Sequence, residues 1–261
     1  MRDPWFPLLI LLIVLVAIWL GVLGPLPGGF ADWLQRWQTL AAAGVASIAA
    51  YVAFQNTTRT LHHGERLERQ RRDRKHAAVR AVLPLALSSL SEYAQESAET
   101  LGNLVDKCDD ETLPRLTATE ELVRPLPADT LKTLSDFIEY TDHGEVRILE
   151  ALIAAIQVHD ARLRGIYSIN NDPNIVGVVI RADLEGRIVD AASIYAGAAV
   201  FYNYARRRSN ELPTSVPWEN VAVALSNMRI WDSEYPRVYE TLERQRSFST
   251  GPFDLPSDGT A

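Results

Sequence analysis

Residues 7–23 read PLLILLIVLVAIWLGVL, an almost purely aliphatic stretch near the start of a 261-residue chain. About 20 apolar residues in a helix span the roughly 30 Å hydrocarbon core of a membrane. A second, alanine-rich stretch, LAAAGVASIAAYVAF, covers residues 40–54, and residues 25–29 between them hold two prolines and two glycines. The pattern predicts a transmembrane helical hairpin with spans at about 6–24 and 37–54.

The second predicted span leaves alternatives open, because alanine contributes little to membrane insertion. Ala42, Ala46 and Ala50 recur every four residues, a spacing that lets a neighbouring membrane helix approach closely. The same stretch is compatible with a soluble alanine-rich helix packed on the rest of the protein. Cleavage of residues 1–31 as a signal peptide is a further alternative, although the apolar run is long for a signal core.

An arginine-rich collar, residues 59–80, follows directly: RTLHHGERLERQRRDRKHAAVR. Eight basic and three acidic residues give it a charge of +5. Basic residues beside a span stay in the cytoplasm, so both ends of the hairpin are expected there, at a bacterial inner membrane. The collar serves as a topology signal or binds anionic lipid headgroups, the expected partner. The residues assigned to this contact are Arg59, Arg66, Arg69, Arg71, Arg72, Arg74 and Lys75.

The remainder of the chain is acidic. Since the whole chain carries −7 and residues 1–58 balance, residues 81–261 carry −12. This charge argues against general nucleic-acid binding, which needs a basic face. The single cysteine, Cys108, rules out an intrachain disulfide and thus a disulfide-stabilised secreted scaffold.

The body has the periodicity of helices throughout, with no run of alternating β-branched residues. Apolar residues three and four apart predict helices over 79–104, 129–141, 144–167, 173–210, 218–228 and 235–246. The expected fold is all-α: a transmembrane hairpin followed by a cytoplasmic bundle of about five to seven helices. The expected parts are an anchor (1–58), the collar (59–80), a helical body (81–246) and a disordered tail (247–261).

One pair of residues is typical of an enzyme. His159-Asp160 would suit a metal-dependent phosphohydrolase, with His143 upstream as a further ligand. His159 also falls within the apolar stripe of its predicted helix, where a buried core histidine is the ordinary explanation. We therefore assign no catalytic residue, no metal and no cofactor.

The segment Trp37-Gln-Thr-Leu40, the alanine-rich stretch, the collar and Ala81-Val-Leu-Pro-Leu-Ala-Leu-Ser88 together show a further likeness. In composition, residues 33–95 resemble a loose group of uncharacterised bacterial membrane proteins of alphaproteobacterial type. The resemblance implies a helical anchor with an arginine-rich collar. It transfers no activity and no site residues.

Three functions follow as hypotheses. The first is a membrane-anchored binding or scaffold protein that binds a protein partner or associates with itself. Its basis is that the predicted helices present faces for packing and the sequence shows no assembled polar site. The second is a metal-dependent hydrolase that uses His143, His159 and Asp160. The third is a small pore or envelope-permeabilising component, with the hairpin as its active part.

Overall fold

The computed structural model describes residues 30–118, 125–141 and 146–253, together with Val16. The chain divides into two compact units, residues 1–71 and 72–261. The described residues form six helices and no β-strand, apart from two isolated bridges that Thr112 makes with Asp109 and Ile180. The all-α prediction is confirmed.

The helix α2 (Phe30–Val105) begins in the first unit and ends in the second, and it continues through Pro84. None of the helices in the described part of the chain combines the length and the apolar character that crossing a bilayer demands. The predicted span at 6–24 lies outside the described residues except for Val16, and the one at 37–54 falls within α2.

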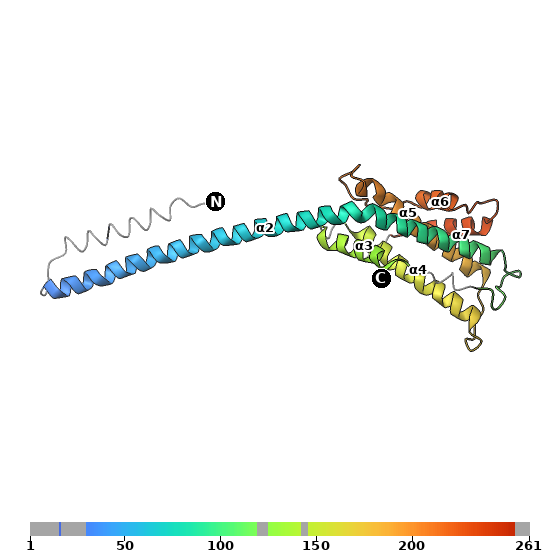
Figure 1. Ribbon diagram of the computed structural model, residues 1–261, viewed down its shortest axis with the longest axis horizontal. Helices are drawn as coiled ribbons and strands as arrows, with labels where there is room; N and C mark the ends of the chain where they lie inside the picture. Colours follow the sequence, from blue (N-terminus) through green and yellow to red (C-terminus); the bar gives the residue numbers. More distant parts are fainter. Residues whose placement is uncertain (1–15, 17–29, 119–124, 142–145, 254–261) are drawn as a thin grey trace. The chain divides into compact units, whose positions relative to one another are not determined.

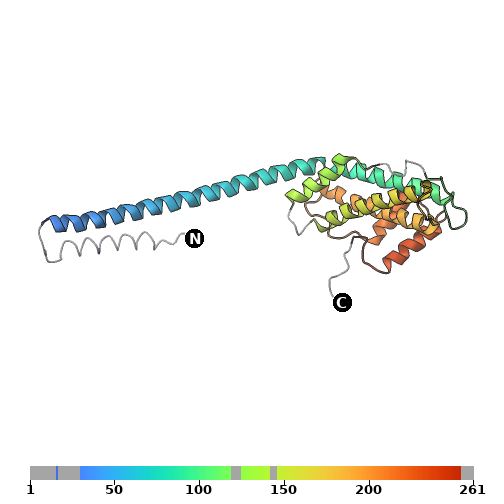
Figure 2. The same ribbon diagram turned by 90° about the horizontal axis from the view of Figure 1, so that it is seen from below.

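The second unit is a helical bundle built around α5 (Figure 1). Residues 72–105 of α2 are followed by α3 (Ala128–Tyr140), α4 (Arg147–Asn171), α5 (Arg181–Ala205), α6 (Trp218–Asn227) and α7 (Pro236–Arg246). Helix α5 packs against α4, α6 and α7, while α3 packs against α4. In the view of Figure 2, α7, in red, forms one edge of the bundle.

The core of the bundle has two halves along the helix axes. One half joins Leu83, Leu87 and Leu90 of α2 to α3, to the start of α4 and to the end of α5. The other joins the end of α2 to the start of α5 and to α6 and α7. Helix α5 therefore runs antiparallel to α2. The apolar stripes predicted in residues 79–104 and 144–167 face this core, as expected.

The prediction of one helix over residues 173–210 is wrong for its first part, because α5 begins only at Arg181. The connector before it is held by other partners. The Arg115 guanidinium donates hydrogen bonds to the carbonyls of Ile169, Asp172, Ile175 and Gly177. These side-chain bonds take the place of a helical ladder, and a local period in the sequence does not reveal them.

The described part of the predicted tail, residues 247–253, contacts the bundle. The Trp218 indole donates a hydrogen bond to the Ser249 carbonyl over 2.8 Å. The Phe253 ring packs beside Gly197 of α5, where a Cβ atom would lie 2.9 Å from the ring and 2.9 Å from a Leu152 methyl group. The missing side chain at residue 197 is thus what leaves room for the Phe253 ring.

Candidate functional site

A groove of about 370 Å³ lies between α5 and α6. Its volume falls in the range of ligand sites, roughly 300–1,000 Å³. Helix α5 contributes Tyr195, Ala196, Ala199, Val200 and Asn203, and helix α6 contributes Asn220, Val223, Ala224 and Asn227. No charged side chain lines it.

The groove follows from residues spaced one helical turn apart. On α5, Ala196, Ala199 and Asn203 share one face, because residues three, four and seven apart lie above one another. Their small side chains leave the space between the two helices open. Val223 adds an apolar wall that is 59% exposed.

Three asparagines give the groove its polar character. The side chains of Asn203, Asn220 and Asn227 make no hydrogen bond with any residue in the described ranges. Each amide offers two N–H donors and a carbonyl acceptor. A groove with small apolar walls and free amides suits an uncharged partner surface, such as a helix with small and polar side chains.

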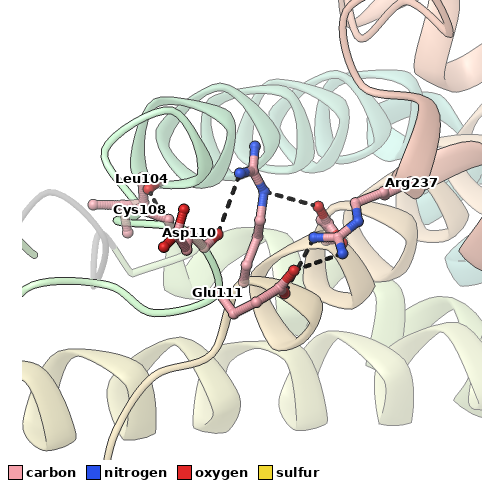
Figure 3. Close-up of polar contacts among 7 residues, drawn as sticks. Leu104, Cys108, Asp110, Glu111 and Arg237 are labelled. Atoms are coloured by element: carbon pink, nitrogen blue, oxygen red, sulfur yellow. Dashed lines mark hydrogen bonds and ion pairs between the residues drawn. The ribbon is translucent and has the colours of Figure 1, made fainter.

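A network of charged residues lies near the junction of α2 and α5 (Figure 3). Arg237 donates to both carboxylate oxygens of Glu111, at 3.1 and 2.7 Å. This hydrogen bond lowers the pKa of Glu111. Arg181 pairs with the buried Glu185 over 3.2 Å. The network joins the loop after α2 to α5 and α7, which is a structural role.

Cys108 lies beside this network and is half-buried (Figure 3). Its thiol donates a hydrogen bond to the Leu104 carbonyl at 3.4 Å. Burial raises the pKa of Cys108 above its usual value. The thiol form is therefore favoured, and a nucleophilic role is disfavoured.

His159 lies in the closed core, with 1% of its surface exposed. Neither ring nitrogen has a hydrogen-bond partner among the described residues, and the Tyr93 hydroxyl is equally unpaired. The two rings meet edge to face, with centroids 6.1 Å apart. Burial, with a smaller effect from Arg187 and Arg162, lowers the pKa of His159 to about 4.

The residues of the hydrolase hypothesis are not brought together in the described part of the chain. Asp160 points to Arg164 and forms an ion pair with it at 2.9 Å. His143 lies outside the described residues. No group of three metal-ligating side chains occurs among the described residues.

The seven predicted headgroup residues are all exposed, but the boundary at Arg71 separates them. The first four belong to the first unit. Arg72, Arg74 and Lys75 belong to the second, where Arg72 donates to the Thr141 carbonyl at 3.4 Å and Lys75 to the Tyr140 hydroxyl at 3.3 Å.

Ala42, Ala46 and Ala50 lie on α2 and are exposed, so their predicted role in helix packing stays a prediction. Comparison with protein-family models, curated proteins and solved structures finds no match to this chain. The groove between α5 and α6 was not foreseen from the sequence. The only available signal was the spacing of small residues and asparagines on two separate helices, which becomes a site only when the helices pair.

We expect His159 to make the body sensitive to acid. Its pKa is near 6.5 when unfolded and about 4 when folded, so the unfolded chain binds the proton first as the pH falls. As the pH falls from 6.5 towards 4, the free energy of unfolding therefore decreases. At pH 5 it is expected to lie about 2 kcal/mol below its value above pH 6.5. Urea unfolding of full-length protein in detergent at pH 7.5 and pH 5 measures it.

His159→Leu is expected to remove that part of the pH dependence, because leucine does not titrate. His63→Leu, which alters an exposed imidazole in the first unit, is the control and should leave the loss unchanged. Equal losses for the wild type and His159→Leu would contradict the assignment.

Proposed function

We propose that the protein is a membrane-anchored helical binding protein. In this proposal the first 58 residues form a hairpin in a bacterial inner membrane, and the body lies in the cytoplasm. The groove between α5 and α6 is the binding site for a helix of a partner protein. The observation that carries the binding role is the row of three unpaired asparagine amides in an uncharged, open groove.

The anchor is supported first by residues 6–24, whose aliphatic composition is that of a membrane span. Residues 37–58 also lack any charged side chain, and at 1.5 Å per residue they would rise about 33 Å. In the described helix, Val45 and Phe54 lie on opposite faces and are 68% and 70% exposed. Large apolar side chains that are exposed on opposite faces of an uncharged segment favour an apolar environment.

Among the described side chains of this segment, the serine and threonine hydroxyls are satisfied within the helix. Ser47 donates to the Ala43 carbonyl at 2.8 Å, and Thr57 donates to the Ala53 carbonyl at 2.9 Å. Such bonds to the residue one turn earlier satisfy a hydroxyl without water. They make these polar residues compatible with a lipid environment. The exposed collar that follows supports a cytoplasmic body.

The groove is tested by photo-crosslinking in membranes. A photoreactive amino acid replaces Val223, and the same residue at Val158, exposed on α4, is the control. We expect an adduct of defined mass from position 223 and none from position 158. Ala199→Arg places a long charged side chain in the groove from an exposed position, so it should reduce the adduct more than tenfold.

The variant must keep the unfolding midpoint of the wild type, which shows that only the groove has changed. The same adducts from both positions, or an adduct that persists with Ala199→Arg, would contradict a binding role for the groove.

A further inference from the structure

The fold brings a second group of arginines beside the end of the collar. Arg206, Arg207 and Arg208 follow α5 directly. From the sequence alone, their position is explained by the favourable placement of cations at a helix C-terminus. They lie far along the chain from Arg72, Arg74 and Lys75. In the fold, the segment that holds the second group contacts Arg80, five to eight residues after the first group on the same helix.

Arg80 fixes this arrangement. Its guanidinium donates to the Tyr204 carbonyl at 3.0 and 2.8 Å and to the Ser209 carbonyl at 2.7 Å. It also lies 3.9 Å from the centre of the Tyr204 ring. The Tyr204 hydroxyl in turn lies 3.2 Å from the His76 ring nitrogen. The segment after α5 is therefore held against residues 76–80 of α2.

The arginines of this segment point outward. Arg206, Arg207 and Arg208 are exposed, and none of them forms an ion pair with another described residue. Arg206 covers the Tyr202 ring at 4.7 Å. Arg207 has a φ of 59° and occupies the left-handed position of a helix-ending turn, in which the Arg208 amide bonds back to the Asn203 carbonyl.

We infer that this basic end of the second unit (Arg72, Arg74, Lys75 and Arg206–Arg208) binds the anionic lipid surface of the membrane. The inference rests on the anchor proposed above. Only residues 59–71, which rise about 20 Å as a helix, separate the proposed anchor from the first of these cations. The chain itself therefore keeps the basic end in the neighbourhood of the membrane.

A lipid surface fits this end better than a nucleic acid does. Residues 81–261 carry −12 in total, so a long polyanion that extends past the basic end would be repelled. Two aromatic rings here are poorly placed for base stacking, because Tyr204 is buried and Arg206 lies over one face of Tyr202. An anionic membrane surface, by contrast, would bind this end through its exposed cations alone.

The test uses the full chain in lipid nanodiscs. Cys108→Ser removes the native thiol, and Asn210→Cys, next to the arginine row, carries a fluorophore. Lipids with quenching headgroups report how closely that position approaches the surface. With phosphatidylglycerol discs we expect strong quenching that declines as salt is raised, and with phosphatidylcholine discs little quenching.

Arg207→Gln with Arg208→Gln should reduce the ratio of surface-bound to released body about thirty-fold, since each arginine near the surface contributes roughly a factor of five. The matched control is Arg229→Gln with Arg244→Gln. It removes the same charge from exposed positions elsewhere, and Arg229 has the same left-handed backbone, with a φ of 62°. The control should quench like the parent protein.

Three results would overturn the inference. They are equal quenching in both lipids, equal quenching by both double variants, or tight binding of single-stranded RNA that requires Arg207 and Arg208. A chain that does not insert into discs at all would instead refute the anchor. The two failures are therefore distinguishable.

Discussion

Asn170→Ala is expected to lower the free energy of unfolding of the body by about 3–4 kcal/mol. The Asn170 side chain is buried near the end of α4. Its carbonyl oxygen accepts hydrogen bonds from the amides of Thr117 and Ala118, both at 2.8 Å. Its amide donates to the Pro114 carbonyl at 2.8 Å. Alanine would leave all three backbone groups without this partner. Each orphaned group costs about 1–3 kcal/mol when it is buried, as the Ala118 amide is, and less when it is partly exposed, as the other two are.

Denaturant unfolding of the full chain in detergent measures the change. Asn174→Ala is the control, because Asn174 is exposed and its side chain only bonds to Asp172 nearby. Its cost should be below about 1 kcal/mol. Similar costs for both variants would show that Asn170 does not hold the loop after α2 to α4.

Phe137→Ala is expected to cost about 3–5 kcal/mol, the usual range for removing a fully buried phenylalanine. Phe137 has no exposed surface and lies in the core between α3, α4 and α5. Its ring meets Tyr204 at a centroid distance of 5.8 Å and His76 at 5.4 Å. The substitution would leave a cavity directly beneath the basic end of the body.

The control is Phe248→Ala, since Phe248 is 84% exposed and its removal should change stability by less than about 0.5 kcal/mol. The readout is the denaturant midpoint of the same full-length protein. A small effect at Phe137 would mean that this half of the core is not packed as described.

The helical periods in the sequence predicted the bundle well. Burial follows a period of 3.6 residues along residues 83–105 of α2 and along α4, and the stripe that includes His159 faces the core. This burial can be predicted from the sequence because it repeats along a single helix, whose apolar face packs against the core. The placement of His159 in a closed core could therefore be foreseen, whereas its lack of a hydrogen-bond partner could not.

The sequence did not predict features that depend on residues far apart in the chain. The Arg115 hydrogen bonds stop α5 from beginning before Arg181, and Gly197 makes room for Phe253. The groove between α5 and α6 and the basic end of the body arise in the same way. Each becomes a site only through the pairing of helices, which no local period records.

The proposed anchoring of the chain, with its body in the cytoplasm, is tested by its topology in a living bacterium. A phosphatase that is active only in the periplasm is fused after Ala261. We expect an inactive reporter in the membrane fraction, because both ends of the proposed hairpin remain in the cytoplasm. An active phosphatase, or a fusion recovered in the soluble fraction, would contradict it.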